Sequence, residues 1–445
     1  MENSTQSRDA DNMDSNNDYD PYLHRKVKKP TTYFESLAHL VKGVLGTGIL
    51  AMPAGIARAG LIPGLAISLL AAAMMTHCMR VLIQQEYYQA KLSRVPYLTY
   101  RDALATGLRR GPEKYRKFAK TLAICVDFFL GFYHTGTGIV YMIFLAESLK
   151  QLVDPIRILP YFVYMIIILF PLLGLNLIPH LKYLAPFSVA ANFVTLIGIV
   201  IVIYFLLSYP KLSDTGIDLW GSPIAYPLYF GTILFALAAV GVLVEIENNM
   251  KKPQQFCPKF GVLNVGMTFL TVLYLLVAIL GYNFCRDRCA DMITLNMPPG
   301  SWLADAVVIM FVMAITVSYP LNVYVPSEII YRYVERRYPD ASEKRKMMFN
   351  LIIRAILPIF TFIIALLVPK IGLFISLFGA FCLSAMAIIF PMLMEAVTRP
   401  RKIVLIKDII IMLCGVMVMI TGTGTALSGI VRSMTESSEL QDETE

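Results

Sequence analysis

A histidine inside a long apolar run is the first residue of this sequence that could do chemistry. His39 lies one turn before Lys42 and two turns before Gly46 in the first such run. An imidazole has an unperturbed pKa of about 6.5, so it exchanges protons near neutral pH. Ionisable groups are costly inside a membrane, which makes each one a functional candidate. His39 is therefore a candidate for proton coupling, and the alternative is a neutral imidazole bonded to a backbone carbonyl.

A second polar face lies in the third apolar run. Asp127, Gly131, His134 and Gly138 follow one another at helical spacing, which places them on one side of a helix. Asp127 and His134 are two turns apart, about 10 Å along the axis, so they cannot hydrogen-bond directly. We interpret this face as one turned into a bundle of helices, with satisfied packing favoured over a polar relay.

Two carboxylates close the sixth apolar run, where Glu245 and Glu247 precede Lys251 and Lys252. The C-terminal end of a helix carries a partial negative charge and disfavours a carboxylate. We therefore expect Glu245 and Glu247 to pair with a cation or to help gate one end of the protein.

The sequence lacks the signals of a metal site or of an enzyme. Cys285 and Cys289 have no histidine partners nearby, which is poor evidence for zinc. Their loop permits a disulfide if it faces an oxidising compartment, and the sequence leaves that question open. Since no nucleophile–base pair, clustered acid–base site or cofactor motif is visible, we expect neither an enzyme nor a cofactor.

The composition identifies the elements that must position these residues. Of the 445 residues, 57% are hydrophobic and only 16% are charged, and the mean hydropathy is +0.62; ordinary soluble domains have about 25% charged residues. These values exclude a soluble domain and a disordered chain, and seven cysteines are too few for a disulfide scaffold. The net charge of +8 does not indicate nucleic acid, because the basic residues crowd the segments between apolar runs. An all-α polytopic membrane protein is predicted.

The apolar residues form eleven runs long enough to be membrane spans. They lie near residues 36–57, 61–84, 120–148, 159–178, 184–208, 223–247, 261–283, 302–333, 349–368, 371–395 and 405–430. Alternate loops are rich in Lys and Arg, which predicts a cytosolic N-terminus. We expect a disordered cytosolic tail at 1–34, an eleven-span domain at 35–432 and an acidic extracytoplasmic tail at 433–445.

Two of the runs contain residues that interrupt helices. The first holds Gly43, Gly46, Gly48 and Pro53, and the sixth is rich in small residues between positions 231 and 241. Packing of small residues explains such a pattern in part. The alternative that we favour is unwound backbone lining a cavity. Because five spans separate the two runs, they predict two inverted repeats of five spans each with a binding site between them.

Broken helices at such a site favour a particular ligand. The N-terminal end of a half-helix offers free N–H groups and a positive dipole, which suit a carboxylate. Carbonyl groups freed at the other break suit an ammonium group. Together they fit a zwitterion, which is the form of a free amino acid.

The run His39–Gly48 closely resembles the first span of proton-coupled amino acid transporters, a family of the amino acid/auxin permease superfamily. The likeness extends over residues 33–430, with further matches at 52–53, 59–60, 76–79, 126–129, 141–146, 247–250 and 324–329. The resemblance implies a leucine-transporter-like fold of eleven spans and symport of small neutral amino acids with protons. It also implies that His39 is important for proton coupling. Substrate contacts are implied at Gly46, Thr47 and Gly48 and at Phe235, Ala236, Leu237 and Ala238.

One departure from the family pattern bears on proton coupling. The family usually has an acidic residue followed by glycine where this chain has Ala238 and Ala239, and often has proline where Glu245 stands. The loss of a carboxylate in mid-membrane puts the coupling in doubt. His134 is a candidate to replace it.

We therefore predict a secondary transporter of small neutral amino acids that works by alternating access and is driven by protons. It would lie in the plasma membrane or the lysosomal membrane, and spans one, two, six and seven would move against the rest. Two alternatives remain open: a carrier without proton coupling, favoured by Ala238, and a membrane receptor that senses amino acids through its tail and loops.

Overall fold

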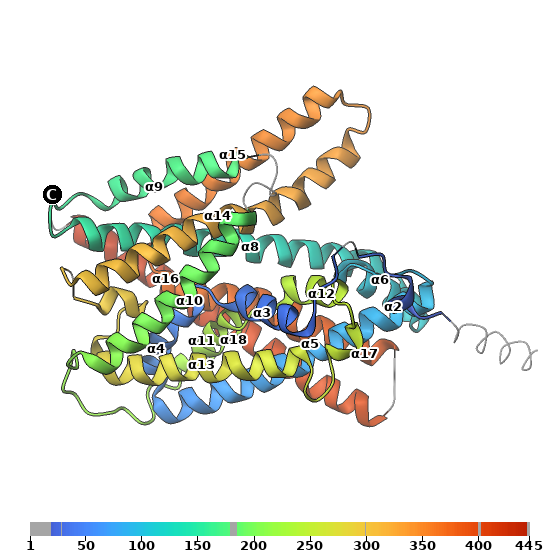
Figure 1. The fold of residues 1–445 in the computed structure, drawn as a ribbon, viewed down its shortest axis with the longest axis horizontal. Helices are drawn as coiled ribbons and strands as arrows, with labels where there is room; N and C mark the ends of the chain where they lie inside the picture. Colours follow the sequence, from blue (N-terminus) through green and yellow to red (C-terminus); the bar gives the residue numbers. More distant parts are fainter. Residues whose placement is uncertain (1–18, 28, 179–184, 299, 399–401, 443–445) are drawn as a thin grey trace, which may run out of the picture.

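The computed structural model describes residues 19–27, 29–178, 185–298, 300–398 and 402–442. Over these residues the protein is helical, and the one β-type pairing is an isolated bridge between Thr31 and Met250. The long helices run roughly along one direction (Figure 1). We call the end that carries residues 19–32 the N-terminal end, and the end that carries Cys285 and Cys289 the disulfide end.

Nine helical segments of the described chain are long and apolar enough to cross a membrane. Seven are single helices: α5 (Leu61–Ser93), α8 (Ala119–Val153), α10 (Ala185–Ser208), α13 (Val262–Cys285), α14 (Trp302–Arg337), α15 (Glu343–Leu367) and α18 (Lys402–Asp442). The other two consist of α11 (Ala225–Ala236) with α12 (Val240–Asn248), and of α16 (Ile371–Phe378), η5 (Gly379–Ile389) and α17 (Phe390–Thr398). The predicted fourth span is the 16-residue helix α9 (Tyr161–Asn176), shorter than the about 20 residues of a straight span.

The first predicted span is a pair of helices that meet at a bend of 56°. Its first half, α3 (Tyr33–Val44), begins at a capping box in which Thr32 and Glu35 satisfy each other's backbone N–H groups. Its second half, α4 (Gly48–Ala59), starts after three non-helical residues. The predicted interruption of this span is confirmed.

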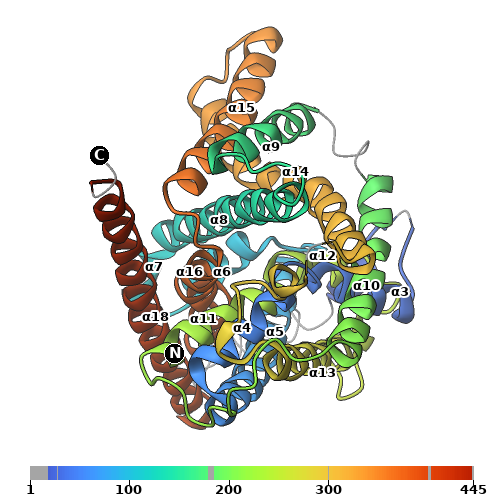
Figure 2. The same ribbon diagram turned by 90° about the vertical axis from the view of Figure 1, so that its left-hand side faces the viewer.

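The break in the sixth span, at residues 237–239, lies against the break in the first. A Cβ atom on Gly48 would lie only 2.6 Å from Ala236 Cα, so only glycine permits this approach. Figure 2, viewed along the bundle, places α4 and α11 centrally, with α8, α13 and α14 around them and α18 at the edge. The two breaks therefore face each other inside the bundle.

A third irregular segment was not predicted. Between α16 and α17, residues Gly379–Ile389 form a π-helix, a conformation found often at functional sites. It packs closely on α11, because a Cβ on Gly379 would clash with Gly231 O.

The predicted disordered tail needs correction over residues 19–27 and 29–34, which pack on the N-terminal end; residues 1–18 lie outside the described chain. Arg25 donates to Pro96 O at 3.0 Å and forms an ion pair with Glu247 at 2.9 Å. Thr31 exchanges backbone hydrogen bonds with Asn249 and Lys251.

Burial, and then the negative charge of Glu247, raise the pKa of Tyr22, which stays a neutral phenol. We call residues 19–27 and 29–32 the strap.

Helix α18 continues into the predicted acidic tail as far as Asp442. Residues 443–445 lie outside the described chain.

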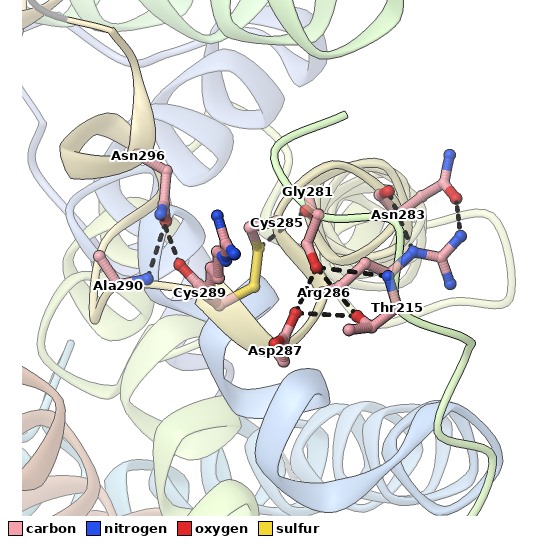
Figure 3. Close-up of a disulfide and its surroundings, with 11 residues drawn as sticks. Thr215, Gly281, Asn283, Cys285, Arg286, Asp287, Cys289, Ala290 and Asn296 are labelled. Atoms are coloured by element: carbon pink, nitrogen blue, oxygen red, sulfur yellow. Dashed lines mark hydrogen bonds between the residues drawn. A yellow bond between two sulfur atoms is a disulfide. The ribbon is translucent and has the colours of Figure 1, made fainter. Parts of the chain in front are cut away.

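At the disulfide end, Cys285 and Cys289 are joined by a disulfide (Figure 3). The loop after them is folded by Asn296, which accepts from Ala290 N–H and donates to Arg288 O. Asp287 accepts hydrogen bonds from Ser213 and Thr215 of the segment before α11. The two cysteines, whose pairing the sequence left undecided, thus lie in a compact loop that contacts the segment before α11.

Candidate functional site

A cavity of about 510 Å³ lies between the two helix breaks. Its walls come from the α3–α4 break, α8, the α11–α12 break, α14 and η5. The lining residues include Gly43, Gly46, Thr47, Gly48, Tyr133, His134, Thr137, Tyr141, Phe235, Ala236, Ala238, Gly241, Glu245, Asn322, Leu383 and Met386. The wall is mainly apolar and aromatic with a few polar groups, which is typical of a small-molecule site.

Backbone groups at the ends of the broken helices lie beside this cavity. The N–H groups of Gly48 and Ile49 have no carbonyl four residues earlier in α4. At the end of α11, Ile233 O accepts from Leu237 N–H at 2.9 Å and Phe235 O from Ala238 N–H at 3.4 Å, and each carbonyl keeps a second lone pair. Thr47 Oγ1 is buried and has no hydrogen-bond partner among the described residues. A ligand with both a negative and a positive group would complement these ends.

Six of the seven predicted contact residues line the cavity: Gly46, Thr47, Gly48, Phe235, Ala236 and Ala238. The side chain of Leu237 is 2% exposed and is not part of the wall. Leu237 is thus the one predicted contact residue that does not line the cavity.

The third span contributes more to the cavity than its sequence indicated. Tyr133, Thr137 and Tyr141 of α8 line the wall, and the ring of Tyr133 meets that of Phe235 edge to face at 5.8 Å. The four-residue spacing of Tyr133, Thr137 and Tyr141 indicates one face of a helix. The aromatic residues around them in the sequence made this pattern hard to recognise. Nothing local in the sequence indicated the η5 residues Leu383 and Met386.

The structure separates Asp127 from His134. Asp127 forms an ion pair with Arg101 of α6 (Tyr100–Arg110) and accepts a hydrogen bond from Tyr333 at 3.0 Å. His134 instead lines the cavity and bonds to Asn322 at 3.1 Å. The two residues share a helix but belong to different networks, in agreement with the expectation that they make no direct contact.

His39 lies outside the central cavity. It is exposed on α3 and lines a second cavity of about 320 Å³, together with Lys29, Lys42 and Glu245. Three residues, Gly43, Val242 and Glu245, line both cavities. The central cavity therefore adjoins a vestibule at the N-terminal end, and His39 lies in that vestibule.

The predicted pairing of the two carboxylates holds for one of them. Glu247 is 3% exposed and pairs with Arg25 of the strap, not with the nearby lysines. Glu245 is exposed and lines both cavities as well as a third, of about 480 Å³, beside α6. Glu245 thus stands where the openings at the N-terminal end converge.

Close contacts cover the cavity at the disulfide end. Arg58 of α4 forms an ion pair with Asp291, which also accepts the N–H of Gly372 at 2.9 Å. Gly60 and Gly221 meet with positive φ angles, and a Cβ on either would lie within 2.4 Å of the other segment's backbone. The cavity therefore opens toward the N-terminal end.

Asp291→Asn is expected to increase access to the cavity from the disulfide end, because it removes the charge that holds α4 and α16 together. The measurement is labelling of Thr137→Cys by an impermeant thiol reagent, relative to the parent protein. Asp305→Asn, at the same end on α14, is the matched control. Equal labelling with and without the Asp291 change would contradict a role for this ion pair in closing the cavity.

Among the described residues, no group of three or more His, Cys, Asp or Glu side chains is placed to hold a metal ion.

Comparison with known proteins relates this geometry to a family. The family model for transmembrane amino acid transporter proteins matches residues 29–428. The proton-coupled amino acid transporter-like protein pathetic of Drosophila melanogaster is 33% identical, covering 96% of this chain and 91% of that protein. The amino acid transporter AVT3C of Arabidopsis thaliana is 26% identical, covering 90% and 91%.

A solved structure supports the fold. A Na⁺-coupled sialic acid symporter, in a substrate-bound outward-open state, superposes with a TM-score of 0.53 at 13% identity, covering 92% of this chain and 91% of that one. The predicted all-α, leucine-transporter-like fold is confirmed, and so is the predicted kinship. The chain belongs to the transmembrane amino acid transporter family.

Proposed function

We propose that this protein moves small neutral amino acids across a membrane by proton symport, through alternating access. The observation that carries the proposal is the cavity between two broken helices, which offers N–H groups from one break and carbonyl groups from the other. Transporters of this architecture bind substrate at interrupted helices near mid-membrane. The name of the Drosophila relative supports proton coupling.

In this proposal the substrate carboxylate binds at the start of α4, at Gly46, Thr47 and Gly48. The substrate ammonium group binds the backbone carbonyls at the end of α11, from Phe235 to Ala238. Tyr133, Tyr141 and Phe235 border the side-chain region of the cavity, and their rings favour small apolar side chains.

The openings support an inward-facing state if the N-terminal end is cytosolic. Basic residues crowd the loops at that end, which supports this orientation. The disulfide at the other end supports it as well, since such bonds persist outside the cytosol. The protein would then lie in the plasma membrane or the lysosomal membrane with its strap in the cytosol.

His39 is the proposed proton-coupling residue, in the vestibule through which a released proton would leave. Uptake of labelled alanine, glycine and proline should rise as the outside is acidified from about pH 7.5 to about pH 5.5, a window around the unperturbed imidazole value of about 6.5. His39→Ala should remove this rise. His24→Ala is the control, because this strap histidine bonds to Asp20 O at 2.9 Å and stacks on Tyr19, outside the vestibule lining.

Other results would select the alternatives. Uptake that is indifferent to pH in the unaltered protein would identify a carrier without proton coupling, as Ala238 suggested. Binding of an amino acid without any flux, by protein that reaches the membrane, would identify a receptor.

A further inference from the structure

The hydrogen bond of His134 defines which of its nitrogens carries a proton. Asn322 Nδ2 donates to Ser318 O at 3.1 Å, which turns Asn322 Oδ1 toward His134 Nδ1 at 3.1 Å. An amide oxygen only accepts, so Nδ1 must be the donor. In the neutral ring, His134 Nε2 is therefore an unprotonated acceptor.

This Nε2 atom faces the start of α12. A Cβ atom on Gly241 would lie 3.6 Å from His134 Nε2. The N–H groups of Val242 and Leu243 both donate to Ala239 O, so Val240 and Gly241 supply the N–H groups that have no carbonyl four residues back inside α12. The lone pair of His134 thus points at the positive end of a helix, which is a favourable arrangement for the neutral ring.

Among the described residues that line the cavity, Glu245 is the one carboxylate, and it is exposed. Tyr133, Tyr141 and Glu245 line the same cavity, and Glu245 stands one turn along α12 at the cavity mouth. Asp127, on the same face of α8, is occupied by Arg101 and Tyr333. From α13, the Tyr274 hydroxyl donates to Val44 O at 3.1 Å, and from η5 Cys382 is buried.

We propose that His134 is a proton switch for α12, the half of the broken sixth span nearer the N-terminal end. With the ring neutral, α12 rests against Nε2; with Nε2 protonated, the imidazolium repels the positive start of α12 and favours a conformation in which that helix has moved away. Asn322, which also lines the cavity, is a positioning residue, since its bond to Nδ1 directs Nε2 at α12. The inference rests on the proposed proton coupling and names the group that couples the proton to helix movement.

The same interaction sets where the proton is released. By linkage, a conformation that disfavours the imidazolium must bind the proton more weakly than one that tolerates it. The conformation seen here opens toward the N-terminal end and holds α12 against His134. It is therefore the proton-releasing conformation, with the vestibule of His39 as the exit.

The first test uses purified protein in liposomes and compares His134→Gln with the unaltered protein. Proton uptake is divided by the alanine counterflow of the same variant, so a change in alanine binding does not affect the ratio, and proton uptake per alanine should fall to background. His77→Gln is the control, because that ring faces Lys407 between α5 and α18, away from the cavity.

Asn322→Asp should move the pH profile upward by about one pH unit or more, since a carboxylate at Nδ1 stabilises the imidazolium. Unchanged proton uptake in His134→Gln, or an unshifted profile in Asn322→Asp, would overturn the proposal.

The second test does not require transport. The rate of thiol labelling at Val242→Cys is measured over the parent protein and divided by the rate for a free thiol in solution at the same pH, because only the thiolate reacts. This ratio should differ between about pH 5.5 and about pH 7.5. Combination with His134→Gln should remove the difference, and combination with His77→Gln should keep it. A pH-dependent ratio that persists without His134 would overturn the switch. Alanine flux without proton uptake in the unaltered protein would instead refute symport, while the labelling would still report on His134.

Discussion

Gly48→Ala is expected to reduce transport about tenfold or more and to lower thermal stability, whereas Gly46→Ala should leave the fold intact. A Cβ on residue 48 would lie 2.6 Å from Ala236 Cα and 3.0 Å from its Cβ. Neither of these Ala236 atoms belongs to a flexible side chain that could turn aside, so helices α4 and α11 must move apart to make room for the added Cβ. Overpacking of this kind costs about 1–3 kcal/mol, and 1.4 kcal/mol corresponds to a factor of about ten.

Gly46 is the matched control because it is two residues away on the same break. The nearest atom to its added Cβ is Tyr141 Oη at 3.8 Å, an ordinary contact distance. The measurements are the melting temperature of the solubilised protein and the initial rate of amino acid uptake. If both variants melt and transport alike, close approach of the two breaks is not what requires glycine at position 48.

The parts of the fold that were predictable from sequence are those written in local patterns. Long apolar runs, and glycine with proline inside the first of them, indicated both the helices and the break before Gly48. The sixth-span break at residues 237–239 followed from a similar run of small residues. The π-helix at Gly379–Ile389 escaped because a one-residue widening of the turn leaves the apolar pattern almost unchanged.

The contacts that were missed join residues far apart in the chain. Arg25 and Glu247 are 222 residues apart, and His134 and Asn322 are 188 apart. A helical face in the sequence shows which residues point the same way but not what they meet, so His134 was grouped with Asp127. The tail was predicted to be disordered because its composition is polar, and composition carries no information about a buried partner for Arg25.

Arg25→Leu is expected to destabilise the protein strongly, because it leaves a buried carboxylate without its cation. The side chains of Arg25 and Glu247 are only 7% and 4% exposed. Removing one partner of a buried ion pair costs about 3–5 kcal/mol, and the measurement is the melting temperature.

The control is Lys346→Leu, which removes a longer ion pair to Glu335 whose side chains are 22% and 46% exposed; exposed pairs contribute about 1 kcal/mol or less. The double variant Arg25→Leu with Glu247→Leu should recover much of the lost stability, since no unpaired charge from this pair remains. Limited proteolysis should cut the strap faster in Arg25→Leu than in the unaltered protein. Equal melting temperatures for Arg25→Leu and Lys346→Leu would mean that the charge of Arg25 does not hold the strap in place.

Because Glu247 lies on the same short helix that meets His134, a firmly held strap would limit how far α12 can move. Any proton-driven displacement of α12 must therefore work against this ion pair.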